Sequence, residues 1–195
     1  SLTDMAEMPD LVMALYGGTG ADTITLGALA QNTSLDLAAG NDTLTLGNFA
    51  NTATLSNIET IAGGSGADTV SLRTTLSTAM AIDLAAGTDK ITLADGGNTG
   101  TVSNTESLIG GNGADVVTLG ATVINGSIDL GAGSDHVLLA AGTNRLSIAN
   151  TETVSGGAGN DTIVLTGTAG STVIGGGGMN FITGGSGIDQ FVLDQ

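Results

Sequence analysis

Aspartates that stand two residues after a glycine recur at nearly regular intervals along the 195-residue chain. The spacing alternates between 20 or 21 residues and 26 residues, so the full period is 46 or 47. A tight glycine turn can direct main-chain carbonyl oxygens inward, and a carboxylate adds a charged oxygen. These are the ligands of a hard divalent cation such as Ca²⁺, which takes six to eight oxygens at about 2.3–2.6 Å. The series consists of Asp22, Asp42, Asp68, Asp89, Asp115, Asp135 and Asp161.

Two kinds of loop carry these aspartates. One kind opens with Gly-Gly, as in "GGTGAD" at 17–22, and the other reads "LAAGND" at 37–42 or a close variant. Both are followed by a run in which polar and apolar residues alternate, as in Thr23, Ile24 and Thr25. Such alternation is typical of a strand with one buried face.

The repeated strands and loops predict an all-β chain, a right-handed parallel β-solenoid in residues 15–195. Each turn is expected to contain two strands, an aspartate loop and a variable return segment. If the 46- to 47-residue period equals two alternating turns, about eight turns stack into a rod roughly 40 Å long. Residues 1–14 are expected to form an N-terminal cap. Only residues 4–15 could be a short helix, which excludes a doubly wound fold.

The composition agrees with a narrow, repetitive interior. Apolar residues make up 41% of the chain, which argues against disorder despite the 33 glycines. Aromatic residues are only 2%, so Leu, Ile, Val and Ala must fill the core in thin layers.

The charge balance limits the partners. The net charge is −16, and the positive side chains are Arg73, Lys90 and Arg145. This excludes a nucleic-acid footprint and makes an anionic membrane surface an unattractive partner. Cations are the natural partners of such a chain. No cysteine is present, so thiolate metal sites and cysteine nucleophiles are excluded.

The glycine-aspartate turns resemble the RTX, or hemolysin-type calcium-binding, nonapeptide G-G-x-G-x-D-x-U-x, in which U is a large apolar residue. The match is close at 17–25, 63–71, 110–118 and 156–164, and in tandem at 175–192. The resemblance implies a parallel β-roll with several Ca²⁺ ions between the loops of successive turns. Besides the seven aspartates, it gives as candidate metal ligands Asn180, Asp189, Gly18, Gly20, Gly64, Gly66, Gly111, Gly113, Gly157 and Gly159.

The chain departs from this family pattern in two ways. Tandem nonapeptides occur only near the C-terminus, and every second turn lacks the leading Gly-Gly. We therefore expect calcium along one edge of the rod. For a single loop the alternative is an aspartate that only forms a turn by binding its own backbone. A column of carboxylates about 4.8 Å apart, however, would repel by about 0.9 kcal/mol per pair in water, and more when desolvated.

The resemblance implies a calcium-binding structural module of a secreted or cell-surface protein of a Gram-negative bacterium. The module would belong to a surface layer, adhesin or matrix component and would fold and become rigid on extracellular calcium. The alternative is the C-terminal export and folding module of a hydrolase or toxin that leaves the cell by type I secretion.

Enzymatic functions find little support in the residues. His136 is the only histidine, so a histidine dyad or zinc cluster cannot be assembled, and no catalytic residue is assigned. A minor alternative is an ice-binding solenoid, because Thr23 and Thr25 form a Thr-x-Thr pair that recurs at 43–45. The pairs are then lost further along the chain, and threonine also suits strands in general.

Other recurrent polar residues are expected to support the corners. Glu59, Glu106 and Glu152 are interpreted as corner caps, and Asn57, Asn104 and Asn150 as an asparagine ladder. Asp36, Asp83 and Asp129 are expected on a solvated strand face, with an additional ligand role left open. At the rod's end, the apolar strand near Phe191 predicts either continuation into further solenoid or end-to-end self-association.

Overall fold

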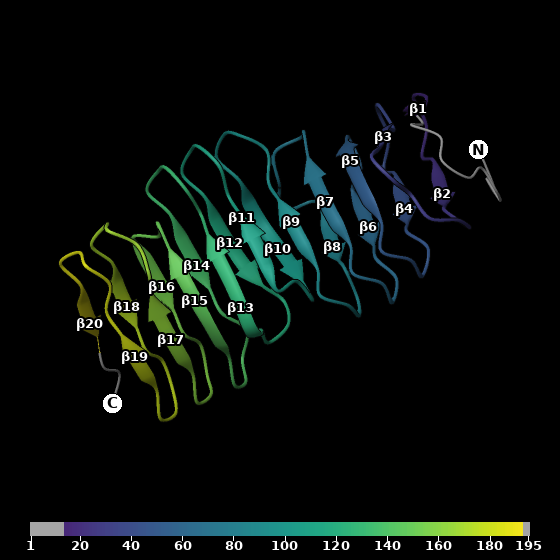
Figure 1. Ribbon diagram of the computed structural model, residues 1–195. Helices are drawn as coiled ribbons and strands as arrows, with labels where there is room; N and C mark the ends of the chain where they lie inside the picture. Colours follow the sequence, from purple (N-terminus) through teal and green to yellow (C-terminus); the bar gives the residue numbers. More distant parts are fainter. Residues whose placement is uncertain (1–13, 193–195) are drawn as a thin grey trace.

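Two parallel sheets of ten strands each make up residues 14–192, the part of the chain that this computed structural model describes. The chain alternates between the sheets, so successive turns stack into a rod (Figure 1). The odd sheet contains β1 (Ala14–Tyr16), β3 (Thr33–Asp36), β5 (Thr52–Ser56), β7 (Thr69–Leu72), β9 (Lys90–Thr92), β11 (Ser107–Ile109), β13 (Ile124–Asp129), β15 (Arg145–Ala149), β17 (Thr162–Leu165) and β19 (Phe181–Thr183). The even sheet contains β2 (Thr23–Thr25), β4 (Thr43–Thr45), β6 (Thr60–Ala62), β8 (Ala81–Asp83), β10 (Thr99–Ser103), β12 (Val116–Leu119), β14 (His136–Leu138), β16 (Thr153–Ser155), β18 (Thr172–Ile174) and β20 (Gln190–Val192). The expected β-solenoid is therefore confirmed.

The core lies between the two sheets and is built by the alternation seen in the sequence. In β4 the side chain of Leu44 is fully buried, while its neighbours Thr43 and Thr45 point outward. Parallel pairing keeps equal positions together, so Leu44 lies opposite Ile61 in the next strand of the even sheet. The buried leucines, isoleucines and valines form one continuous cluster along the rod. Burial of about 25 cal/mol per Å² of apolar surface makes this cluster the main source of stability.

The repeat of 46 or 47 residues covers five strands, not the four that two turns would need. Asp22 precedes β2 and Asp68 precedes β7, so one period equals two and a half turns. The expectation of a double turn was therefore wrong. The reason is that the variable return segment expected after the strand at 43–45 itself contains a strand, β5, which pairs with β3 and β7. Nine turns consequently separate β1 from β19, one more than expected.

Residues 14–192 contain no helix. Accordingly, no helix in this part of the chain is long and apolar enough to cross a membrane. The cap expected at residues 1–14 lies almost entirely outside the described residues, as do residues 193–195.

Candidate metal sites at the corners

The glycine-aspartate loops form corners on two opposite edges of the rod. Because one repeat spans two and a half turns, consecutive repeats place their aspartates before strands of different sheets. The candidate ligands therefore lie on two edges of the rod, and not on the single edge expected from the sequence. The corners before the even sheet hold Asp22, Asp42, Asp115, Asp135 and Asp189, and those before the odd sheet hold Asp68, Asp89, Asp161 and Asn180.

One oxygen of each stacked aspartate closes the corner of the preceding turn. The main-chain N–H of Asp22 donates to Oδ1 of Asp42 at 2.7 Å, and that of Asp68 donates to Oδ1 of Asp89 at 2.7 Å. Asp161 donates in the same way to the side-chain oxygen of Asn180 at 2.9 Å. These bonds satisfy main-chain groups that the strand ladders leave free at each corner.

The second carboxylate oxygen of five of these aspartates has no partner. Within residues 14–192 the Oδ2 atoms are buried and accept no hydrogen bond, and the five side chains are at most 1% exposed. A buried carboxylate oxygen without a partner is costly, and a hard cation would remove that cost. The donor atoms therefore fit Ca²⁺. The five residues are Asp42, Asp89, Asp115, Asp135 and Asp161.

Three other aspartates use Oδ2 within their own loop. The N–H of Gly18 donates to Asp22 at 3.0 Å, and the N–H of Gly185 donates to Asp189 at 2.8 Å. Gly64 makes a longer bond of 3.4 Å to Asp68. The turn-forming role considered for a single loop is thus present at these three corners.

Burial raises the pKa of two aspartates, Asp89 in a Leu-Ala-Ala-Gly loop and Asp135 in the Leu-Gly-Ala-Gly variant. Desolvation raises the pKa of Asp89, and the charges of Asp68 and Glu106 raise it further, while the N–H of Asp68 opposes the shift. Desolvation is also the largest cause of the raised pKa of Asp135. The charges of Asp115 and Glu152 raise this pKa further, and the N–H of Asp115 opposes the shift. Both carboxylates would thus gain from a cation at neutral pH.

Glutamates close the corners one turn beyond these aspartates, as the sequence predicts. Oε2 of Glu59 accepts the N–H of Asp42 at 2.8 Å, and Oε2 of Glu106 accepts the N–H of Asp89 at 2.7 Å. The carboxylates therefore form stacks of three, and the members of each stack lie on the same edge of the rod. The three stacks are Asp22–Asp42–Glu59, Asp68–Asp89–Glu106 and Asp115–Asp135–Glu152.

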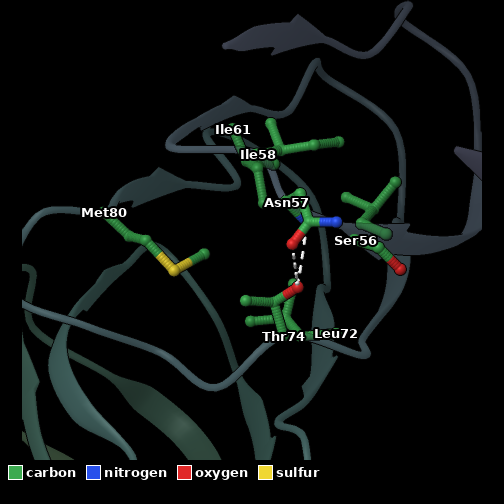
Figure 2. A pocket seen from close by; sticks show the side chains of 8 residues that line it. Ser56, Asn57, Ile58, Ile61, Leu72, Thr74 and Met80 are labelled. Carbon is green, nitrogen blue, oxygen red and sulfur yellow. Dashed lines mark hydrogen bonds between the residues drawn. The ribbon is translucent and has the colours of Figure 1, made fainter. Parts of the chain in front are cut away.

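The expected asparagine ladder is wrong, because consecutive members lie on opposite edges. Instead, the amide of Asn57 donates to Oδ1 of Asp36 in the neighbouring turn at 2.7 Å, and the other two asparagines bind Asp83 and Asp129 likewise. Each of these aspartates also accepts the N–H two residues ahead, so it organises a turn. Figure 2 shows Asn57 beside Thr74, whose hydroxyl donates to it at 3.2 Å, with Met80 on the other side of an apolar pocket.

Three corner residues that sequence reasoning missed are Asn51, Asn98 and Asn144. All three are at most 1% exposed, and the N–H of each donates to the aspartate 17 residues later at 2.8–3.0 Å. The constant spacing of 17 residues was the available signal. Aligning the chain on its aspartates alone concealed it.

Close stacking explains why glycines occupy the corners. A Cβ atom on Gly113 would lie 2.5 Å from the carbonyl carbon of Gly96 in the preceding loop, and the φ angle of Gly113 is +120°. Both facts exclude a larger residue without distortion. Successive loops are therefore close enough for one ion to contact both.

Among residues 14–192, no three His, Cys, Asp or Glu side chains are placed to hold one metal ion. A calcium ion at these corners would therefore depend on main-chain carbonyl oxygens as well as carboxylates, as the glycine-rich loops allow.

Comparison with known families gives one match. The family model described as the RTX calcium-binding nonapeptide repeat (4 copies) matches residues 14–28, 55–72, 103–121, 149–165 and 164–191. The matched segments contain the Gly-Gly loops, whereas the loops of Asp42, Asp89 and Asp135 lie outside them. No curated protein and no solved structure matches the chain significantly.

Proposed function

Because the chain belongs to the RTX calcium-binding repeat family, we propose that it is a structural module that folds and becomes rigid when it binds extracellular calcium. One observation carries the proposal: five buried carboxylate oxygens accept no hydrogen bond. Ligand groups that come together only in the folded chain convert binding energy into stability. Calcium would thus act on the fold rather than on a substrate.

The ligands would come from the corner loops. The aspartates supply charged oxygens, and the glycines four and two residues before them supply carbonyl oxygens in the Gly-Gly loops, for example Gly111 and Gly113 before Asp115. Several ions would lie between loops of successive turns on both edges of the rod. The Leu-Ala-Ala-Gly corners are included, because Asp42, Asp89 and Asp135 have unpartnered Oδ2 atoms. Calcium supplies the positive charge that offsets the desolvation of these carboxylates.

A rod of this kind suits a spacer in a surface layer, adhesin or matrix of a Gram-negative bacterium. The acidic chain, with a net charge of −16, gains calcium at the millimolar concentrations found outside cells. The same physics would serve the alternative, a C-terminal export and folding module of a type I secreted hydrolase or toxin. The complete reading frame distinguishes them, since a catalytic domain before Ser1 would favour the alternative.

The central test compares the chain in chelator with the chain in about 1 mM calcium. We expect calcium to raise the melting temperature strongly and to increase the strand signal in circular dichroism. Magnesium at equal concentration should do much less, because it demands rigid octahedral coordination and gives up its water reluctantly. Identical spectra and melting curves in chelator and in calcium would refute the proposal.

A further inference from the structure

The buried asparagine Asn98 occupies a corner equivalent to that of an aspartate. Asn98 stands directly before β10 and Asp115 directly before β12, and these strands are neighbours in the even sheet. The N–H of Asn98 donates to Oδ1 of Asp115 at 2.8 Å, just as the N–H of Asp115 donates to Oδ1 of Asp135 at 2.8 Å. The two side chains therefore occupy equivalent corners, with an amide on Asn98 where Asp115 has a carboxylate.

The amide nitrogen of Asn98 lies between two main-chain carbonyl oxygens. Nδ2 is 2.9 Å from the oxygen of Ala94 and 2.9 Å from that of Gly96, which stand four and two residues before it. The other two buried asparagines repeat the arrangement. Asn51 donates to the oxygens of Gly47 and Phe49 at 2.9 and 2.8 Å, and Asn144 donates to those of Ala140 and Gly142 at 2.9 and 3.3 Å.

The same two positions hold the glycines proposed as calcium ligands in the aspartate loops. In the loop of Asp115 they are Gly111 and Gly113. The backbone is also turned alike at the second position, since φ is +110° at Gly96 and +120° at Gly113. In the next repeat, Gly142 and Gly159 have φ angles of +117° and +140°. At the first position the loops differ, since φ is +112° at Gly111 and +78° at Gly157 but is not positive at Ala94 or Ala140. The equivalence of the loops therefore holds for the second carbonyl and the corner side chain.

The balance of donors and acceptors differs between the loops. In the Asp115 loop the carboxylate Oδ2 is buried without a donor, so this corner needs a positive charge. In the Asn98 loop Nδ2 lies within hydrogen-bonding distance of both carbonyls and of Oδ1 of Asp115 at 2.9 Å, so its two hydrogens serve three acceptors and one hydrogen is shared. The asparagine corner is therefore satisfied by the protein's own atoms.

We propose that the loops of Asn51, Asn98 and Asn144 close without calcium because the side-chain amide takes the position that the ion occupies in the aspartate loops. The inference rests on the proposed function and divides the corners into two classes. Each asparagine corner adjoins an aspartate corner on the same edge. It therefore holds a neighbouring ligand loop in register before calcium arrives.

The test is to turn an asparagine corner into an aspartate corner. Asn98→Asp removes the amide and leaves two carbonyls beside a carboxylate, so the variant should bind one more Ca²⁺ per chain than the wild type. Native mass spectrometry and equilibrium dialysis in calcium count the ions. In chelator the variant should melt below the wild type, and calcium should reduce the difference. Asn125→Asp is the matched control, since Asn125 is exposed and the change adds the same charge; its ion count should stay unchanged.

The reciprocal variant Asp115→Asn should bind one ion fewer and melt above the wild type in chelator. If Asn98→Asp fails to fold, the ion count and melting temperature of Asp115→Asn test the inference instead. A folded Asn98→Asp chain with an unchanged ion count, or an Asp115→Asn chain that keeps every ion, would overturn the inference while leaving the proposed function intact. A wild-type chain that binds no calcium would instead refute the proposed function.

Discussion

The main-chain N–H of Asp115 donates to Oδ1 of Asp135, one turn further along the rod, at 2.8 Å. The same carboxylate keeps its Oδ2 buried and without a partner. One side chain thus serves two purposes, since Oδ1 closes a corner while Oδ2 remains free for a cation. Removing an aspartate will therefore affect both the apo fold and its response to calcium, and the two effects must be measured separately.

Asp115→Ala should reduce the rise in melting temperature that calcium produces more than Asp129→Ala does. Asp115 has an unpartnered buried oxygen, whereas Oδ1 of Asp129 accepts the amide of Asn150 at 2.8 Å and the N–H of Gly131 at 3.1 Å. Both variants lose hydrogen bonds, so both should melt lower in chelator. Calorimetry with and without calcium separates the two contributions, and equal losses of the calcium-dependent shift would contradict the assignment of Asp115 as a ligand.

Acidification should stabilise the chain in chelator. Burial raises the pKa of Asp89 above its ordinary value near 3.8, so the folded state binds the proton more tightly than the unfolded state. Stability should therefore increase as the pH falls through the raised pKa, and the gain should be complete below the ordinary value. In calcium the sign should reverse, because protons compete with the ion for the ligands.

Asp89→Asn is the control for this pH dependence. The substitution removes the titrating group at one corner, so the gain on acidification in chelator should be smaller than in the wild type. Thermal melts between about pH 7 and pH 4 provide the measurement. An undiminished gain would show that another group is responsible.

Gly113→Ala should destabilise the chain by about 1–3 kcal/mol, because the φ angle is +120° and the added Cβ would meet the backbone of Gly96. Gly20→Ala is the matched change, because Gly20 occupies the same position in a loop of the same type. Among residues 14–192, a Cβ on Gly20 would meet no atom within 4 Å, so that variant should be nearly neutral. Denaturant unfolding in calcium compares the two, and equal effects would disagree with the observed stacking of the loops.

End-to-end association in calcium should depend on the last described turn. Phe181 in β19 is 68% exposed and Phe191 in β20 is 44% exposed, and within residues 14–192 each of these strands has a partner on one side only. Unpaired strand edges with exposed apolar side chains promote pairing with another chain. Light scattering should show assemblies in calcium that Phe181→Lys weakens, and monomers at every concentration would contradict this expectation.

The sequence predicted those parts of the fold in which polar and apolar residues alternate strictly. Ile24 and Leu44 stand among threonines, so the buried face and the parallel stacking followed from the sequence. The number of strands in a repeat did not, because Leu76 and Val123 occupy corner positions that hold Asp or Asn in other turns. Their N–H groups are capped by Asn98 and Asn144, whose meaning depends on contacts with the neighbouring turn.

The half-integer repeat has a consequence for how such a gene can change length. Gain or loss of one 46-residue unit would keep the apolar core but move every later residue to the opposite sheet, because each unit contains five strands. Gain or loss of two units would return each residue to its original side. Duplications that preserve a surface on this rod are therefore expected to occur in pairs.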